Sequence, residues 1–394
     1  MSESGPSRSG RSVRTLLFTG PGGAGTSTLA ASAAVRAARA GRRTVLISAQ
    51  GVPVPGLHEV RGLEVVRVDP QAALEQLWGG VAEDLGPMLP QLSLPPSSSV
   101  VPMPGGAELA LFVELSRAEA DLVVVDAGPL EAAAVLVGLP ATLRWWLGQL
   151  LPPGMRALGA VRTAAVAAGA ARRGPVDVAL SAVPLLQGLL ARDRLAPPDG
   201  TALCLVALPA TASAARLRTA ATALGLHGLR PAAVLSRVLP VDGAGEWAAR
   251  RGADQKVALA AFAAVAPVRQ LPEAAVAAGD VEALAGLLEG FEPPPAASVA
   301  ASGPERRDGS WQLTVPLPFA ERGAVQLTRW LDDLVITVAG ARRCLPLHPL
   351  LRRCEVTGGR LADPGDADAR LEVGFRPDPQ LWPADLLAAE ERTS

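Results

Sequence analysis

Short apolar runs alternate with longer alanine-rich segments through the first two thirds of the chain. The runs are continuously apolar, which is typical of parallel strands buried on both faces of a sheet. After the first run, residues 27–40 are rich in alanine and precede Gly41, a pattern that predicts a helix with a glycine stop. The predicted strands are residues 14–19, 44–48, 63–68, 122–126, 202–208 and 232–236. This order predicts an α/β domain with a doubly wound, mostly parallel sheet over residues 12–291.

A helical insertion is predicted at about residues 131–200, where the strand–helix alternation stops and prolines punctuate apolar, helix-like segments. Within it, apolar side chains recur at helical spacing: Trp145, Trp146, Leu147, Leu150 and Leu151. Such a patch is either buried core or an exposed groove, and core is the more frequent case.

The apolar period changes to two after residues 292–310, a linker rich in proline, serine and glycine. Trp311, Leu313 and Val315 alternate with polar residues, and a turn at residues 339–340 separates two further apolar runs. This pattern predicts a small all-β sandwich over residues 311–376. Residues 1–11 are predicted to be disordered and residues 377–394 to form a loose tail.

Composition narrows the function classes. The chain has 394 residues and a formal net charge of −1, so attraction to nucleic acid is not expected. Its cysteines, Cys204, Cys344 and Cys354, form neither a CxxC motif nor a plausible disulfide framework, which favours a reducing compartment. The N-terminus lacks a signal-peptide pattern, and the charge-free stretch at residues 85–107 contains too many prolines for a membrane helix. A cytoplasmic protein without a transmembrane segment is therefore expected.

One segment has a clear chemical pattern. Directly after the first apolar run come Gly20, Pro21, Gly22, Gly23, Ala24, Gly25, Thr26, Ser27 and Thr28. The spacing matches the phosphate-binding loop G-x-x-x-x-G-K-[ST], with Thr26 in place of the lysine. Glycines let main-chain amides converge on phosphate oxygens, and the following helix directs its positive dipole end toward them. The alternative is a tight strand-to-helix turn without a ligand.

The loop resembles G-K-G-G-x-G-K-[ST]-T, the variant of the ATPases related to the arsenite-pump subunit ArsA and the tail-anchored-protein-targeting ATPases. Four further segments resemble motifs of these ATPases, in the same order along the chain. Residues 45–50 resemble V-L-L-V-S-T-D, and residues 104–108 resemble P-G-x-x-E. Residues 123–129 resemble V-V-D-T-A-P, and residues 235–240 resemble V-N-R-V-L-P. Residues 315–319 and 334–343 resemble the α-crystallin-like (small heat-shock) module of some bacterial members. The resemblance covers nearly the whole chain and implies a P-loop NTPase fold.

The resemblance also implies roles for single residues. Ser27 would ligate Mg²⁺ and Asp126 would support the metal from behind. The segment with Ser236 and Arg237 would lie beside the adenine of ATP or ADP, although serine there replaces the family's asparagine. The implied zinc cysteines have no counterpart, so no zinc is expected.

Three departures from the family pattern weaken catalysis. Pro21 and Thr26 replace two lysines that contact the phosphates, and Gln50 replaces the aspartate that positions the attacking water. An amide cannot accept a proton as a carboxylate does. ATP hydrolysis is therefore expected to be weak or lost. Candidate arginines to replace the missing charge are Arg14, Arg36 and Arg156.

The favoured interpretation is a pseudo-ATPase that handles hydrophobic clients or assists a catalytically intact paralogue. The family implies a homodimer or such a heterodimer, and peripheral membrane contact is compatible with it. Two alternatives stay open: an active ATPase of anion efflux or membrane-protein targeting, and a nucleotide-free binding or oligomerisation module.

Overall fold

The computed structural model describes residues 14–382, except for 86–92, 102–103, most of 151–174, 196–199, 242–244, 299 and 308–309. A seven-stranded sheet forms the centre of the larger domain, and all its neighbouring strands are parallel. Across the sheet the strands are β3 (Leu63–Arg67), β2 (Thr44–Ser48), β4 (Leu122–Pro129), β1 (Thr15–Gly20), β5 (Thr201–Ala207), β6 (Pro231–Val238) and β7 (Val268–Pro272). The predicted fold class is confirmed. β7 was not predicted, because this edge strand includes Arg269 and Gln270 and lacks a continuous apolar run.

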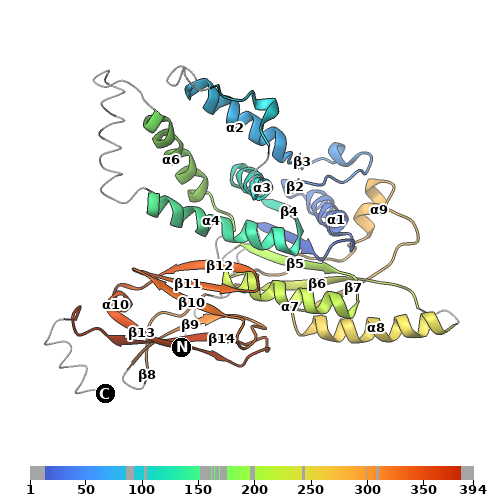
Figure 1. Cartoon of the computed structure of the whole chain (residues 1–394). Coiled ribbons are helices and arrows are strands. Elements are labelled where there is room, and N and C mark those ends of the chain that lie inside the picture. The colour runs from blue at the N-terminus through green and yellow to red at the C-terminus, as the bar shows by residue number, and fades with distance from the viewer. Residues whose placement is uncertain are drawn as a thin grey trace, which may run out of the picture.

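Helices cover both faces of the sheet (Figure 1). Successive β1 residues alternate between the faces: Leu16 and Phe18 belong to one buried cluster and Leu17 to the other. The first cluster includes residues of α1 (Thr26–Arg39) and α9 (Val281–Gly286). The second is covered by α3 (Gly106–Arg117), α4 (Leu130–Leu150), α7 (Thr211–Leu226) and α8 (Glu246–Ala263). The central strand β1 is therefore fully buried, and its carboxyl end fixes the position of the loop that follows.

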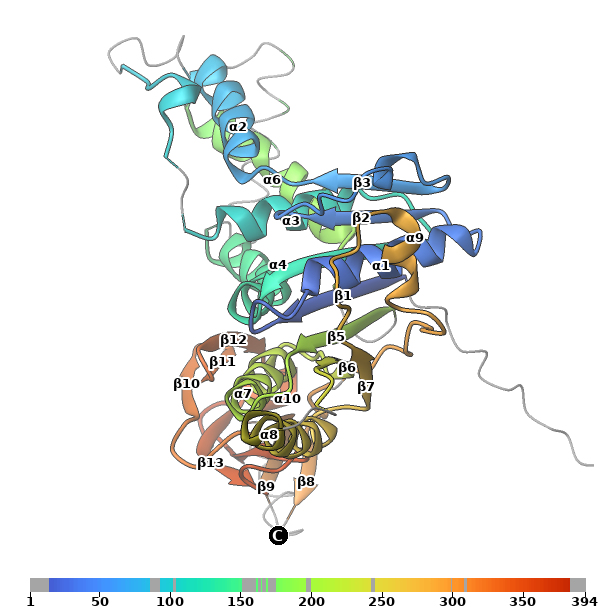
Figure 2. The same ribbon diagram turned by 90° about the vertical axis from the view of Figure 1, so that its right-hand side faces the viewer.

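A helical layer extends beyond the sheet (Figure 2). It contains α2 (Pro70–Leu85), the short 3₁₀ helix Ser97–Ser99, the distal part of α4 and α6 (Pro175–Ala191). The first half of α4 packs into the core through Leu130, Ala133 and Leu136. The helical layer thus draws on two separate segments of the chain, only the second of which lies in the predicted insertion.

Among the described helices, α4 alone is long and apolar enough to cross a membrane, judged by length and composition. Packing explains part of this apolarity, because α4 contacts β4, α3, α7 and β12, although only 33% of its apolar window is buried.

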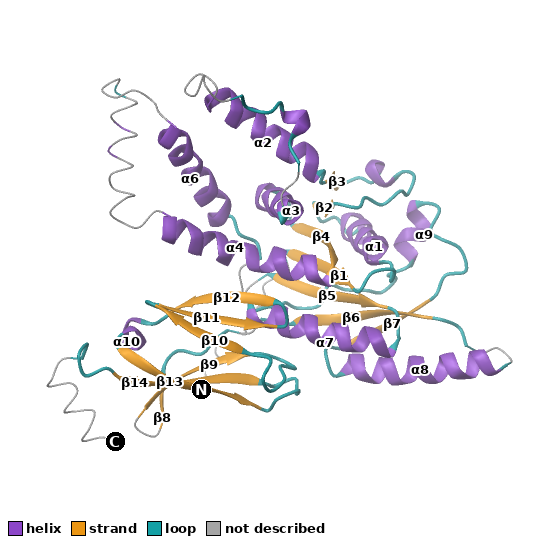
Figure 3. Cartoon of the chain, in the orientation of Figure 1, coloured by secondary structure: helices purple, strands orange, loops and turns teal. Residues whose placement is uncertain are grey.

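The C-terminal domain is a β-sandwich, as the period-two pattern predicted (strands orange in Figure 3). One sheet contains β10 (Gln326–Trp330), β11 (Asp333–Val338) and β12 (Ala341–Pro346). The other contains β13 (Cys354–Ala362), β14 (Arg370–Pro377), β9 (Ser310–Pro316) and β8 (Glu305–Arg307). The short helix α10 (Pro349–Arg352) follows β12. The predicted turn between β11 and β12 is present, with positive φ angles at Ala339 and Gly340.

The sandwich packs directly on α7 and α4 of the larger domain. Ala223 and Leu226 of α7 belong to the same buried cluster as the sandwich core. The Thr222 hydroxyl donates a hydrogen bond of 2.6 Å to the Pro318 carbonyl oxygen. A guanidinium nitrogen of Arg343 donates one of 2.6 Å to the Leu226 carbonyl oxygen. The two domains therefore share apolar core as well as polar contacts.

Candidate functional site

The loop of residues 20–28 lies at the carboxyl end of β1 and leads into α1. Gly22, Gly23 and Gly25 have φ angles of 97°, 70° and 87°, a region that side chains disfavour. A Cβ atom added to Gly22 or Gly23 would meet nothing within 4 Å, so this part of the loop faces open space. No side chain caps α1, and the first amides of a helix have no partner within it. The loop can thus present main-chain amides to an anion.

Gly20 is required for a different reason. A Cβ atom there would lie 2.1 Å from the Val206 carbonyl oxygen of the neighbouring strand β5. This close approach lets β1 end against β5 before the chain turns into the loop. The glycine-rich pattern therefore combines strand packing at Gly20 with loop conformation at the later glycines.

A hydrogen-bond network joins the ends of β2 and β4 behind the loop. Asp126 is almost fully buried, and one carboxylate oxygen accepts a hydrogen bond of 2.8 Å from the Ser48 hydroxyl. The other accepts one of 3.2 Å from the Gly128 amide. Ser48 in turn accepts hydrogen bonds from the amides of Gln50 and Gly51. Asp126 therefore orients the segments that follow both strands.

Gln50 and Ser27 meet in front of this network. The Ser27 hydroxyl donates a long hydrogen bond of 3.4 Å to the Gln50 side-chain oxygen. Two neutral oxygen atoms are thus close together where the loop becomes α1. Oxygen atoms of this kind suit Mg²⁺, which also retains several water molecules. Asp126 contacts Ser48 and Gly128, and its role in supporting such an ion stays a prediction.

Two arginines lie beside the loop, and they differ from the arginines proposed from sequence as replacements for the missing charge. A guanidinium nitrogen of Arg237 donates to the Gly23 carbonyl oxygen at 3.3 Å, and another would lie 3.6 Å from a Cβ atom on Gly25. Arg237 also pairs with Glu273 at 2.5 Å. Arg216 of α7 donates to the Pro21 carbonyl oxygen at 2.8 Å and pairs with Glu131 at 3.1 Å.

The sequence-based replacements are placed elsewhere. Arg14 directly precedes β1, at the amino end of the sheet, opposite the loop. Arg36 lies in the last turn of α1, far along the helix from its N-terminus. Neither can supply charge at residues 20–28, and Arg156 lies outside the described residues. Arg216 lies in no sequence motif, so only the packing of α7 shows that its guanidinium lies beside the loop.

Ser236 is fully buried in β6, next to β7. Its hydroxyl oxygen has no hydrogen-bond partner among the described residues. A base-contacting role for Ser236 stays a prediction, and it would require the ligand to reach the buried end of the strand. Arg237, the next residue, is the half-exposed member of this pair.

The predicted apolar patch is exposed at two of its residues and partly buried at two others. Trp146 and Leu150 of α4 retain 50 % and 67 % of their accessible surface, and Leu185 of α6 retains 55 %. Trp145 packs edge-on against Trp146 and donates a hydrogen bond of 3.2 Å to Asp333 of the sandwich. The interpretation as buried core is therefore wrong for Trp146 and Leu150, whereas Leu147 is partly buried and packs against the core cluster. Leu151 lies outside the described residues.

Other reactive side chains are distant or shielded. None of the three cysteines forms a disulfide, and burial raises the pKa of the Cys204 thiol to about 12. Within the described ranges, no three His, Cys, Asp or Glu side chains are grouped closely enough to hold a metal ion. The expectation of no zinc stays a prediction.

The central parallel sheet with a glycine-rich loop after its first strand defines a P-loop-like α/β protein. The family model for an anion-transporting ATPase matches residues 13–262, and one for the HSP20-like domain found in ArsA matches residues 308–375. The chain therefore belongs to the ArsA family of anion-transporting ATPases and has the family's HSP20-like domain.

Two similar proteins match nearly the whole chain. An uncharacterized Streptomyces coelicolor protein is 34% identical over 94% of this chain and 99% of its own length. A Mycobacterium tuberculosis protein is 29% identical over 94% of this chain and 98% of its own length. The arsenical pump-driving ATPase of Escherichia coli is 30% identical, over 19% of this chain and 15% of its own length. The likeness to that ATPase is thus confined to a short part of both chains.

Proposed function

We propose that residues 20–28 bind the phosphates of ATP or ADP through main-chain amides and that hydrolysis is very slow or absent. The observation that carries this proposal is the open loop itself, with three left-handed glycines and an uncapped helix end but no lysine. Pro21 and Thr26 offer no positive charge, and Gln50 offers no carboxylate. Phosphoryl transfer depends on positioning and charge stabilisation, and both are reduced here.

Binding is expected to be weak. A hydrogen bond to a charged group contributes about 1.5–3 kcal/mol, so each missing lysine weakens binding by roughly tenfold to a hundredfold. Arg237 compensates in part, because its guanidinium lies beside Gly23 and Gly25, although Glu273 shares its charge. The hydroxyl of Ser27 and the side-chain oxygen of Gln50 would hold Mg²⁺, which would supply positive charge to the phosphates.

The exposed apolar side chains of α4 and α6 support a second part of the proposal. Trp146 and Leu150 of α4 and Leu185 of α6 are exposed on two helices that contact each other, and we infer that this apolar surface takes an apolar helical segment of a client protein. We infer that the protein acts in the cytoplasm on such clients, as a homodimer or together with a catalytically intact paralogue.

Calorimetric titration of the full chain with Mg·ATP and Mg·ADP tests nucleotide binding, and phosphate release tests hydrolysis. Thr26→Lys should tighten the Kd at least about tenfold, because it restores a charge-assisted contact. Thr142→Lys on the exposed face of α4 adds the same charge away from the loop and should leave the Kd unchanged. Equal affinities in both variants would count against a phosphate site. Ordinary hydrolysis that survives Gln50→Ala would overturn the pseudo-ATPase proposal.

A further inference from the structure

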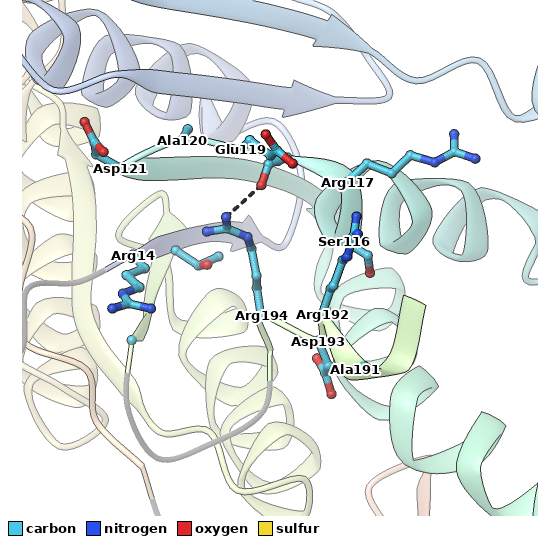
Figure 4. Close-up of a pocket in the computed structure, with 13 residues that line it drawn as sticks. Arg14, Ser116, Arg117, Glu119, Ala120, Asp121, Ala191, Arg192, Asp193 and Arg194 are labelled. Carbon is cyan, nitrogen blue, oxygen red and sulfur yellow. Dashed lines mark hydrogen bonds between the residues drawn. The ribbon is translucent and has the colours of Figure 1, made fainter. Parts of the chain in front are cut away.

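A polar pocket lies at the amino ends of the central strands, whereas residues 20–28 lie at the carboxyl end of β1. Its volume is about 620 Å³, and it lies beside the first residues of β1 and β5. Residues 116–121 at and after the end of α3 and residues 191–194 at and after the end of α6 form its walls. Figure 4 shows Arg14, Arg192 and Arg194 around this pocket, opposite the segment that contains Glu119. It is separate from the proposed nucleotide site, because β1 runs the length of the sheet between them.

Two of the three acidic residues of the pocket, Asp121 and Asp193, are paired with arginines that lie outside it. Asp121 accepts hydrogen bonds of 3.1 Å from the amide and the guanidinium of Arg43. Asp193 pairs with Arg144 at 2.9 Å. Neither Arg43 nor Arg144 lines the pocket. The two aspartates therefore do not balance the arginines inside it.

Four arginines line the pocket, and one of them, Arg117, pairs with Glu114 at 3.2 Å. Three guanidinium groups and one carboxylate of the pocket then remain without an ion-pair partner among the described residues. Arg14 and Arg192 are exposed and have no side-chain hydrogen bond or ion pair among the described residues. Arg194 donates a hydrogen bond of 2.7 Å to the Ala118 carbonyl oxygen, which leaves its charge unbalanced. Glu119 is the remaining acidic group of the pocket. This balance leaves an excess of about two positive charges.

The surroundings of two lining residues also favour an anion. Burial and the nearby positive charge of Arg14 lower the pKa of Arg194. Thr15 is 1 % exposed, and its hydroxyl has no hydrogen-bond partner among the described residues, although hydroxyls in such positions are usually satisfied. An anion in the pocket would relieve the repulsion between the two arginines.

We infer that this pocket binds a small molecule that has at least two phosphate or carboxylate groups. Its volume falls in the range of small-molecule sites, about 300–1,000 Å³. Guanidinium groups bind both anions through paired N–H donors. A concave site with three arginines that lack an ion-pair partner fits a compact multivalent anion better than an extended polymer, and the chain's net charge of −1 does not favour nucleic acid.

Calorimetric titration of the full chain with inorganic pyrophosphate and, separately, citrate tests this inference. Arg14→Ala and Arg192→Ala should each weaken binding at least about tenfold, since each removes one charge-assisted contact. Both side chains are exposed, so neither change should disturb folding, and circular dichroism checks this. Arg322→Ala, at an exposed position of the sandwich, is the matched control and should leave binding unchanged.

Pyrophosphate can also occupy residues 20–28, so Arg237→Ala separates the two sites. A binding event lost in Arg192→Ala but kept in Arg237→Ala belongs to the pocket. Arginine-dependent binding of one probe alone supports the inference and identifies the preferred anion. It is overturned if neither probe binds the wild-type chain at millimolar concentration, or if the Arg14 and Arg192 variants bind both probes as the wild type does.

Discussion

Arg237 places a positive charge beside the loop, where the family has two lysines. Its guanidinium contacts the Gly23 carbonyl oxygen and lies beside Gly25, so its removal takes a cation from the loop. Arg237→Ala should weaken Mg·ADP binding by roughly tenfold to a hundredfold. Titration calorimetry measures the change, with Arg322→Ala as the control. An unchanged Kd would mean that the main-chain amides alone hold the ligand.

His227, which lies far from the loop, is expected to make the stability of the fold depend on pH. Burial, and secondly the Arg343 guanidinium, lower its pKa from 6.5 to about 4, so the folded state favours the neutral ring. The unfolded chain binds the proton below about pH 6.5, so this contribution to stability is complete above that pH and is lost as the pH falls toward 4. The loss should reach about 2 kcal/mol near pH 5.

Urea unfolding at about pH 7.5 and pH 5 measures this loss. His227→Gln should lower stability at the higher pH and flatten the pH dependence, because it has no proton to bind. His58→Gln, at an exposed position, should retain the wild-type dependence. A similar slope in all three proteins would assign the effect to other groups.

The sequence allowed some site residues to be predicted and not others, for a physical reason. The loop is local in sequence, so glycine spacing and the preceding apolar run were sufficient to predict where it lies. The contacts of Ser48 with Asp126 and of Arg216 with Pro21 join residues far apart in the chain. They depend on strand order and helix packing, which no local motif encodes.

The same distinction holds for secondary-structure elements. Buried strands β1, β2 and β4 have continuous apolar runs and were predicted to within a few residues. The edge strand β7 was missed, because edge positions tolerate polar side chains. For the exposed part of α4, buried core was expected more often than an exposed groove, and the sequence could not decide between them, since an apolar stripe has the same spacing on a surface as in an interior.

The exposed patch on α4 and α6 gives a prediction at this scale. Trp146→Ser should weaken binding of a fluorescent apolar helical peptide of about 20 residues by several-fold, because the indole supplies much of the apolar area. Trp247→Ser on α8 is the matched control, since Trp247 is 69 % exposed outside the patch. Fluorescence anisotropy measures both affinities. Equal losses in the two variants would indicate nonspecific adsorption to exposed tryptophan.

At the scale of the whole molecule, two helices connect the loop to the sandwich. Arg216 near the start of α7 contacts Pro21, and Thr222 and Leu226 near its end contact the sandwich. Likewise α4 begins directly after β4, and Trp145 near its end donates to Asp333. A ligand that orders the loop should therefore also stabilise the contact between domains.

The docking depends on close packing at Gly225, where an added Cβ atom would lie 2.8 Å from Pro318. Because the domains share one buried cluster, calorimetric unfolding of the wild type should show one transition. Gly225→Ala should separate it into two, since the proline ring must move and the shared core opens. Gly188→Ala, in a helix with nothing within 4 Å, is the control and should stabilise by about 0.5–1 kcal/mol. A single transition with an unchanged midpoint in Gly225→Ala would mean that the two domains unfold together without help from the close packing at Gly225.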